Sequence, residues 1–369
     1  MIPILFEDTE TNFTHNGIGR LVDCLSCVVT EERNGIYECE FTYPITGKWF
    51  NELMQGGIIG VIHDDNHDIQ PFDIYKSSAP IDGVVTFNAH HVSYRLNNVV
   101  LEPYTAANAS DAIDGILLHS VNTNGFTFTT DKTTVANFAL TRPQSVRATL
   151  MGTEGSFLDT FGKADFKFNQ FAVSMLADRG SDTGVTVRYG KNMTGITRER
   201  DEGECFSAIV PFWQGEETTV YPSTYIVTPT TTVTPIVPVV MDFTGDFDSE
   251  PSEADLTAAA RKYLDDNEPW KGSDTITVDF TAMWQTPQYE AVAAIQKVGL
   301  CDTVSVYFTA MGIVAEKAKV QQVKFNVLTE QFDEITLGTI SKAYVAITDG
   351  TSDTSNIPIG AIACGYAAK

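Results

Sequence analysis

The residues whose types and spacing could support chemistry lie in one short polar segment, HDDNHD. His63, Asp64, Asp65, His67 and Asp68 supply two imidazoles and three carboxylates, which are ligands that zinc accepts. On a helix, His63 and His67 would share a face, but the segment lies between two expected strands, where Asp-Asp-Asn is typical of a turn. A turn would point these side chains in several directions. We therefore expect no metal, and His63, Asp65 and His67 are the candidate ligands if one binds.

Two other pairs invite a chemical reading. His90 and His91 are adjacent in an expected strand, so they face opposite sides and cannot chelate one ion together. One of them is expected to be buried and hydrogen-bonded. Cys24 and Cys27 form a C-x-x-C pair, which could bind a metal or do redox chemistry. The pair lies in the alternating run LVDCLSCVV without a second such motif, so packing within a strand is the expected role.

No nucleophile signature is visible in the sequence. The GTEGS segment at 152–156 lacks the spacing of a G-x-S-x-G elbow, and there is no P-loop and no HExxH motif. With 48 Asp and Glu residues, chance pairs of carboxylates are common, and only a fixed separation in a cleft would make a pair catalytic. We therefore expect no catalytic residue, no enzyme activity and no cofactor.

The charge of the chain is strongly acidic, with 24 Lys and Arg against 48 Asp and Glu and a formal net charge of −24. Nucleic-acid binding through phosphates relies on cations that displace counterions, so this chain is not expected to hold DNA. An acidic surface can serve solubility, or it can repel DNA that passes close by. The basic cluster of Arg179, Arg188 and Lys191 has two open readings, pairing with acids across a subunit boundary or a solvated hairpin.

Apolar periodicity predicts the elements that position these side chains. The first hundred residues alternate with period two between turn signals, which indicates a barrel or a sandwich. Ser110 is a predicted helix N-cap, and Ser252 with Asp255 predicts a capping box for a helix over 252–267. Residues 299–345 alternate in two strands after a helix ending at Gly299, which predicts a small β-barrel. The apolar-rich run 226–240 contains three prolines, so no membrane insertion is expected, and the N-terminus has no basic n-region of a secretory signal.

Seven segments in a fixed order carry a family resemblance. They are EERNGIYECEFTYPITG (31–47), QPFDIYK (70–76), FNAHHVSYRL (87–96), RPQSVRATLMGTEGSFLDTFG (142–162), FAVSMLADRGSDTGVTVRYGKNMTGI (171–196), MDFTGDFDSEPSEADLTAAARKYL (241–264) and KVGLCDTVSVYF (297–308). Together they resemble the minor structural proteins of siphophage tail tips, also called tail-associated or prophage tail endopeptidase proteins. The resemblance spans essentially residues 1–345.

The resemblance implies a fold similar to the baseplate hub of contractile-tailed phages, of the α+β class and mainly β. It implies two tube-type β-barrel domains with smaller inserted α/β domains. The expected parts are a first barrel at 1–100, an α+β insertion at 101–165, a second barrel at 166–240 and 299–345, a helix-containing α+β insertion at 241–298 and a flexible tail at 346–369.

The resemblance also implies a function. Three chains would form a homotrimer at the distal end of a virion tail, in contact with the distal tail protein, the tape-measure protein and a receptor-binding or lytic tip protein. Genome DNA would pass through without specific binding, and the protein would be made in the bacterial host cytoplasm. The lytic label belongs to longer members with a following hydrolase domain, and Lys369 falls about where such a domain would begin. We therefore expect no lytic activity.

Two further hypotheses remain open. The first is a cell-wall hydrolase or endopeptidase that uses acidic residues, helped by the segment from His63 to Asp68. The second is a carbohydrate-binding tip that stacks sugars on tryptophans, although core or interface packing is the simpler role for these rings. The four tryptophans are Trp49, Trp213, Trp270 and Trp284.

Overall fold

The computed structural model describes most of the chain in two compact units. The first unit comprises residues 1–194, 278–305 and 317–337, and the second comprises the remainder. The described residues are 1–63, 68–78, 80, 82–122, 125–151, 155–188, 193–201, 205–215, 218–247, 249–271, 273–280, 297–308 and 313–338. Strands predominate over helices among them, which confirms the expected class.

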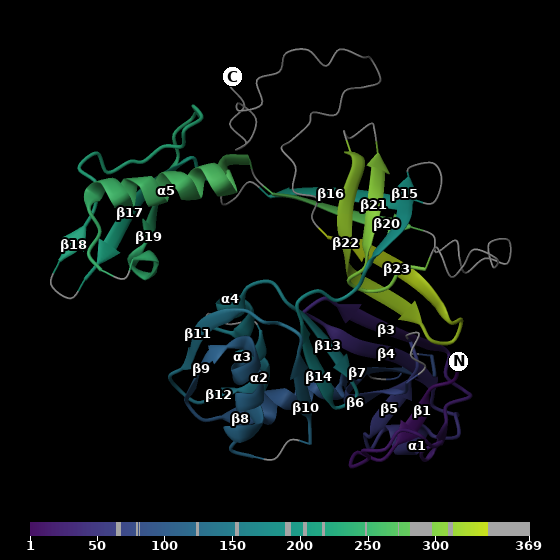
Figure 1. Ribbon diagram of the computed structural model, residues 1–369. Helices are drawn as coiled ribbons and strands as arrows, with labels where there is room; N and C mark the ends of the chain where they lie inside the picture. The colour runs from purple at the N-terminus through teal and green to yellow at the C-terminus, as the bar shows by residue number, and fades with distance from the viewer. Residues whose placement is uncertain are drawn as a thin grey trace, which may run out of the picture. The chain divides into compact units, whose positions relative to one another are not determined.

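The largest sheet contains eleven of the described strands, and its order is β15, β21, β22, β3, β4, β7, β6, β5, β1 and β2, with β23 paired to β22 (Figure 1). The short helices α1 (Phe50–Leu53) and η1 (Val92–Asn98) lie before β5 and after β7. The strand bounds are β1 (Ile4–Phe6), β2 (Gly19–Arg20), β3 (Ser26–Glu32), β4 (Tyr37–Pro44), β5 (Ile58–Val61), β6 (Gln70–Ser77), β7 (Val84–His91), β15 (Asp182–Arg188), β21 (Thr303–Phe308), β22 (Ile313–Asn326) and β23 (Gln331–Leu337).

Strict alternation explains why β3, β4 and β7 form the centre of this sheet. Buried and half-exposed residues alternate along all three strands, as expected when one face packs on a core. Phe41 lies opposite Phe87 in the ladder, and their rings stack 5.0 Å apart. The β3–β4 turn places Asn34 at φ 54°, a left-handed conformation that Asn tolerates. The alternation predicted over the first hundred residues is therefore confirmed.

The C-terminal strands extend this same sheet. β22 pairs with β23 on one side and with β3 on the other, for example Val323 opposite Glu31 and Phe325 opposite Val29. Val327 packs in the core formed by the N-terminal strands. In the described part of the chain each sheet is an open succession of strands, so the two separate barrels remain a prediction.

A mixed segment follows η1 and packs on the same core. Helix α2 contributes Ile113 and Ile116 to it, and a Cβ on Gly115 would lie 2.5 Å from the Tyr104 ring, so only glycine fits there. Ser110 is not the N-cap that the sequence predicted, because the side chain of Asn108 accepts the capping hydrogen bond from the Asp111 amide. The elements are β8 (Val100–Leu101), β9 (Tyr104–Asn108), α2 (Ala109–Leu118), β10 (Thr127–Thr130), β11 (Val135–Leu140), β12 (Gln144–Ser145), α3 (Val146–Leu150), α4 (Phe157–Phe161), β13 (Asp165–Asn169) and β14 (Ala172–Leu176).

Three small sheets complete the first unit. β9 pairs with β11, β8 pairs with β12, and β14 lies between β10 and β13. β13 and β14 are antiparallel neighbours in sequence, and their buried residues Phe166, Phe168, Val173 and Met175 join the main core. This packing makes one continuous core from the N-terminal sheet and the mixed segment.

The second unit contains a three-stranded sheet covered by one helix. The order is β18, β17 and β19, and α5 packs Leu256, Ala260 and Leu264 against it. Ser252 is confirmed as the N-cap of α5, because its hydroxyl accepts a hydrogen bond from the Asp255 amide. The Asp255 carboxylate accepts from the same hydroxyl, so the reciprocal half of the predicted capping box is not confirmed. The elements are β16 (Met193–Asp201), β17 (Ala208–Gln214), β18 (Thr219–Val220), β19 (Pro238–Asp242), η2 (Thr244–Asp246), α5 (Glu253–Asn267), η3 (Pro269–Lys271) and β20 (Ser273–Phe280), with β16 paired to β20.

Some predictions fall outside the described residues. These include most of the helix expected before Gly299 and the tail expected at 346–369. The division into five parts remains a prediction. None of the described helices is long and apolar enough to cross a membrane.

Candidate functional site

Of the three candidate ligands His63, Asp65 and His67, the structure describes His63, and its side chain is buried. Its Nε2 lies 2.6 Å from the hydroxyl of Tyr37, whose ring packs edge-on against it. Asp65 and His67 lie outside the described residues. Within the described ranges no group of three or more His, Cys, Asp or Glu side chains could hold a metal ion. The geometry of His63 is therefore that of a core histidine bonded to a tyrosine.

The adjacent histidines behave as the alternation predicted. His91 is completely buried and accepts a hydrogen bond at Nδ1 from the Ser93 amide, whereas His90 faces outward and lies 3.2 Å from Glu38. Burial lowers the pKa of His91 well below its ordinary value, and the nearby His63 and Arg147 add to this effect. His91 is therefore neutral at physiological pH.

The thiols of the C-x-x-C pair belong to the core. Cys24 and Cys27 are both buried, and the sulfur of Cys27 lies 3.6 Å from that of Cys39. Hydrogen bonds from Cys24 and Cys39, together with burial, raise the pKa of Cys27 well above its ordinary value. A thiol held protonated is a poor nucleophile, so the expected packing role fits its environment.

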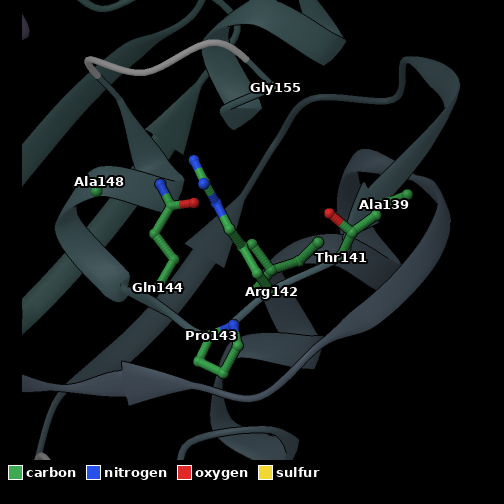
Figure 2. Close-up of a pocket in the computed structure, with 8 residues that line it drawn as sticks. Ala139, Thr141, Arg142, Pro143, Gln144, Ala148 and Gly155 are labelled. Atoms are coloured by element: carbon green, nitrogen blue, oxygen red, sulfur yellow. The ribbon is translucent and has the colours of Figure 1, made fainter.

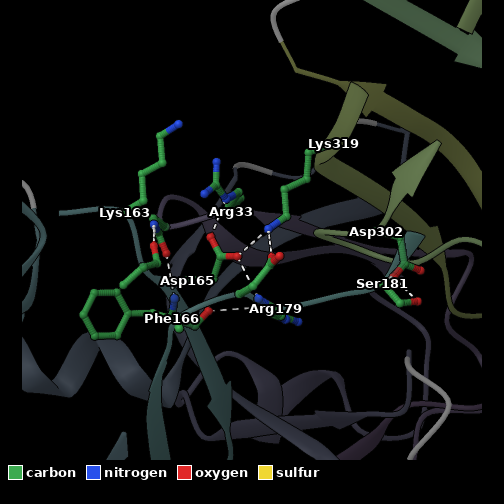
Figure 3. A network of polar contacts seen from close by, with 12 residues as sticks. Arg33, Lys163, Asp165, Phe166, Arg179, Ser181, Asp302 and Lys319 are labelled. Atoms are coloured by element: carbon green, nitrogen blue, oxygen red, sulfur yellow. Dashed lines mark hydrogen bonds and ion pairs between the residues drawn. The ribbon is translucent and has the colours of Figure 1, made fainter. Parts of the chain in front are cut away.

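The most concentrated polar site of the first unit is a buried carboxylate, Asp165, whose residue is 1% exposed. Figure 3 shows three groups from separate parts of the chain converging on it. Arg33 Nε donates to Oδ1 over 2.5 Å, and Lys319 Nζ donates to Oδ2 over 2.6 Å. The backbone amide of Arg179 also donates to Oδ2, over 2.8 Å. We call these residues, with Glu31 and Asp178, the Asp165 cluster.

The electrostatics of Asp165 follow from these contacts. Burial alone would raise its pKa, but the hydrogen bonds from Lys319, the Arg179 amide and Arg33 outweigh burial and lower it. Lys319 also pairs with Asp178. The carboxylate is therefore ionised and fully partnered, which is the condition under which a buried charge is tolerated.

A second ion pair lies beside the first. The guanidinium of Arg179 contacts the buried Glu31 carboxylate at 2.8 Å and donates to the carbonyl of Phe166 at 3.2 Å. The interpretation as a solvated hairpin is thus wrong for Arg179, since it pairs with a buried acid of its own chain, and pairing of the cluster across a subunit boundary stays a prediction. Lys191 lies outside the described residues, and Arg188 is exposed at the end of β15.

The Asp165 cluster joins elements that are distant in sequence. Arg33 belongs to the β3–β4 turn, Asp165 begins β13, and Lys319 lies on β22. Next to it, Asp302 accepts a hydrogen bond from the Ser181 amide over 2.7 Å. A Cβ on Gly180 would lie 2.4 Å from the Cys301 carbonyl oxygen, so the two backbones approach closely. The arrangement can hold strands together, and its charges are all compensated.

Sequence reasoning missed this cluster. Asp165 alternates with Lys167 and Asn169 along β13, so the pattern indicates a polar, outward face. Only the approach of Arg33 and Lys319, 132 and 154 residues away in sequence, makes the position buried. No local signal distinguishes Asp165 from the other 47 acids.

The outward face of the main sheet is a second candidate surface. In the ladder, Thr30 lies opposite Glu38, Glu38 opposite His90, and His90 opposite Asp73. The row continues to Lys324, opposite Thr30, which pairs with Glu334 at 2.7 Å. Acids and partners therefore alternate across the strands on this face.

An open pocket lies in the mixed segment, with a volume of about 840 Å³. Arg142 is its one cationic lining residue, and the lining includes neither an acid nor a histidine, so it offers no pair for general acid–base catalysis. Figure 2 shows the lining residues, which are Ala139, Leu140, Thr141, Arg142, Pro143, Gln144, Ala148 and Gly155.

The tryptophans proposed as sugar platforms are placed as follows. Trp49 packs against the main core, and the Lys48 ammonium lies 4.2 Å from its ring centre. Trp213 and Trp270 pack in the core under α5. Trp284 lies outside the described residues. The three described rings therefore take part in packing.

Comparison with known structures identifies the fold as that of phage tail proteins. Prophage tail protein gp18 of Listeria monocytogenes matches with a TM-score of 0.53 over 93% of this chain and 95% of that chain, at 12% identity. The 43 kDa tail protein of prophage MuSo2 from Shewanella oneidensis gives 0.55 over 92% and 97%, also at 12% identity. A tail protein from Neisseria meningitidis gives 0.51 over 87% and 92%, again at 12%.

The resemblance that the seven segments carry is therefore confirmed at the level of the fold. The matches extend over nearly the whole of each partner structure, so the likeness is to complete tail-protein chains. No protein-family model matches the chain, and no curated protein sequence is similar to it. The likeness to these tail proteins is thus seen in the fold and not in the sequence comparisons.

Proposed function

We propose that this chain is a structural component of a phage or prophage tail, acting as a homotrimeric hub at the distal end of the tail tube. The observation that carries the proposal is the fold, shared over nine-tenths of the chain or close to it with tail proteins of three bacteria. The compensated charges of the Asp165 cluster support a structural role, because a site poised for proton transfer would keep a group free.

The hub places two tube-type barrels per chain in a ring, so three chains supply six. Closed cyclic assembly requires each chain to present two different complementary surfaces. A permanent ring requires interfaces that are large and apolar at their centres. The open edges of the sheets are suitable places for such strand pairing.

DNA passage is consistent with the charge. Three copies together carry a formal charge of −72, three times −24. Binding of DNA requires Lys and Arg side chains that neutralise phosphates and release their counterions, and this chain has twice as many acids as such cations. The genome would therefore pass without being held. The protein then contacts the distal tail protein and the tape-measure protein on the tube side and a receptor-binding or lytic protein at the tip. It is made in the host cytoplasm and ends in the virion.

Native mass spectrometry of the purified chain at micromolar concentration tests the hub. We expect a species of three chains, with no larger open-ended series. A monomer that stays monomeric on adding the distal tail protein would contradict the proposal.

A DNA-binding measurement tests the passage. At physiological salt we expect no retention of duplex DNA, and we expect weak binding to appear only at low ionic strength. Specific binding that survives physiological salt would contradict a passive conduit.

The alternative of a cell-wall hydrolase finds no supporting geometry among the described residues, since His63 bonds to Tyr37 inside the core. A zymogram against bacterial walls, with His63→Ala and His67→Ala as comparison variants, tests it. We expect no clearing with any of the three proteins, and clearing that both substitutions abolish would establish the alternative.

A further inference from the structure

Four planar side chains form a stacked column in the first unit. The rings of Tyr75 and His90 lie 3.7 Å apart with an interplanar angle of 13°, and those of His90 and Tyr94 lie 4.3 Å apart at 8°. The guanidinium carbon of Arg147 lies 4.0 Å from the centre of the Tyr94 ring. The column thus alternates tyrosines with groups that carry or can accept positive charge.

The inner end of the column is fixed in the fold. Arg147 is on α3, and its guanidinium also donates to the carbonyl of Gly35 over 3.2 Å. Burial lowers the pKa of Arg147, and the neighbouring Tyr94 partly opposes this effect by raising it. One guanidinium is therefore already held on a tyrosine face at this end, in the arrangement known as a cation–π contact.

The outer end of the column is produced by a β-bulge. The register between β6 and β7 shifts between Ile74 and Lys76, so Tyr75 is an extra residue in its strand. A bulge re-aims the side chain it carries. Here it sets the Tyr75 ring flat on His90, which faces outward from the next strand.

Half of Tyr75 remains exposed for a partner. The residue is 50% exposed although His90 covers one face of the ring at 3.7 Å. Glu38 contacts His90 at 3.2 Å, and Glu40 accepts a hydrogen bond from Asn88 at 3.1 Å in the neighbouring row. Glu38 lies opposite His90 and Glu40 opposite Asn88, on β4, the strand that follows β6 and β7 in the sheet. Burial first, and then the charges of Glu38, Tyr94 and Glu40, raise the pKa of the Tyr75 hydroxyl.

We propose that the open face of Tyr75, with Glu38 and Glu40 beside it, is a docking point for an arginine side chain presented by a partner protein. The incoming guanidinium would stack on Tyr75 as Arg147 stacks on Tyr94, so the column would carry a guanidinium at each end. Arginine fits better than lysine because its planar group both stacks and pairs with carboxylates. Phosphate-bearing ligands are repelled by the two carboxylates.

The other charged groups on this face set how strong the contact can be. Asp73, opposite His90, is neutralised by Arg95 at 2.6 Å. Lys76 lies opposite Asn88 and next to Tyr75, so its ammonium opposes an incoming cation. Removal of Lys76 should therefore strengthen binding, a result that no purely structural role of the column predicts.

The test uses the purified full chain and two small probes that differ by one charge, acetyl-Gly-Arg-Gly-amide and the same peptide with citrulline. Binding is followed by ligand-detected NMR titration. We expect the arginine probe to bind about tenfold more tightly than the citrulline probe, in the range of an exposed or partly desolvated cation–π contact. No binding of the arginine probe, or equal binding of the two, overturns the proposal.

Variants locate the contact. Tyr75→Leu is expected to lower affinity for the arginine probe about fivefold while Tyr75→Phe keeps it, because the ring and not the hydroxyl carries the stack. Glu40→Gln lowers affinity and Lys76→Gln raises it, each about two- to threefold. Tyr225→Leu is the matched control, since Tyr225 is a 53% exposed tyrosine stacked on Tyr221 in the second unit. Equal losses for Tyr75→Leu and Tyr225→Leu would show general attraction to an acidic protein and overturn the proposal.

A third probe separates another ligand class. Tyrosine faces flanked by acids also stack sugars, so an N-acetylglucosamine tetramer is titrated in the same way. Binding of the sugar that depends on Tyr75, with none of the arginine probe, would assign the platform to carbohydrate and overturn the proposal. The inference does not rest on the proposed tail function, because it is argued from the Tyr75 column and its neighbouring charges alone.

Discussion

The Asp165 cluster and the outward face of the main sheet use the same ion chemistry in opposite surroundings. Asp165 is almost fully buried and has three donors, whereas the Lys324–Glu334 pair on the outward face has side chains that are 39% and 33% exposed. Water screens the charges of the Lys324–Glu334 pair, whereas the charge of Asp165 is compensated by protein groups. The same ionic contact is therefore structural in one place and replaceable in the other.

The two adjacent histidines repeat this contrast at single-residue scale. His91 lies in the core with its Nε2 unpartnered among the described residues, while its neighbour His90 stacks between two tyrosines and contacts Glu38. Protonation of His91 would bury an uncompensated charge, whereas a proton on His90 would lie beside the Glu38 carboxylate. Burial, and not residue type, decides what each imidazole can do.

The largest expected effect is the loss of the Asp165 carboxylate. Asp165→Ala removes the acceptor of Arg33 Nε and of the Arg179 amide and leaves Lys319 with Asp178 alone, and removing one member of a buried charge pair costs about 3–5 kcal/mol. Urea unfolding followed by circular dichroism measures the change. Asp182→Ala is the matched control, because Asp182 pairs with Lys317 where both side chains are about half exposed, and its loss should change stability far less than that of Asp165. Equal losses would remove the distinction between the two regions.

An intermediate effect is the pH dependence contributed by His91. Because its folded pKa is depressed, the unfolded chain takes up a proton near pH 6.5 that the folded chain does not, so stability falls as pH drops below about 6.5. One such proton gives a slope of at most about 1.4 kcal/mol per pH unit. Urea midpoints between pH 7 and pH 5 measure this slope. We expect His91→Gln to reduce the slope of stability against pH and His90→Gln to leave this slope unchanged. The reverse result would contradict the burial argument.

A lower pH window reports on Asp165 itself. Its folded pKa is lowered, so its stabilisation is present above the unfolded pKa near 3.9 and is lost as pH falls through the folded value. Unfolding midpoints below pH 4 should therefore decline more steeply for the natural chain than for Asp165→Asn. Parallel curves for the two proteins would show that the cluster does not hold an ionised carboxylate.

The smallest expected effect is on the outward face. Lys324→Ala removes an exposed cross-strand ion pair, and such pairs contribute about 0.2–1 kcal/mol. The change should shrink further in high salt, because screening shortens the range of exposed charges. Thermal unfolding at two salt concentrations measures both. A loss of stability as large as that of Asp165→Ala would contradict the distinction between the buried cluster and the outward face.

Much of the fold could be predicted because its signals are local. Alternation through Tyr37, Cys39, Phe41 and Tyr43 predicts β4, and the Ser252–Asp255 pair predicts the start of α5. The N-cap of α2 was predicted two residues late, because Asn108 and Ser110 are both good caps and only the backbone at Asn108 is extended. Periodicity and capping signals therefore predict that an element exists, and they decide less well which of two nearby capping residues begins it.

The candidate sites were less predictable because they depend on contacts across the chain. The composition of the HDDNHD segment suggested candidate metal ligands, but His63 is buried and forms a hydrogen bond with Tyr37. Arg179 looked like a surface cation, and it pairs with the buried Glu31. The Tyr75 column needs a bulge that no local pattern marks. In each case the partner lies on another strand or helix.

By itself the sequence determined the mainly β character, the acidic charge, the α5 helix and a likeness to tail proteins that the fold then bore out. Only the tertiary structure decided that β22 joins the N-terminal sheet, which acid is buried, and which histidine is neutral. The reason is physical. Periodicity is fixed by neighbours along the chain, whereas burial and pKa depend on groups that folding brings from more than a hundred residues away.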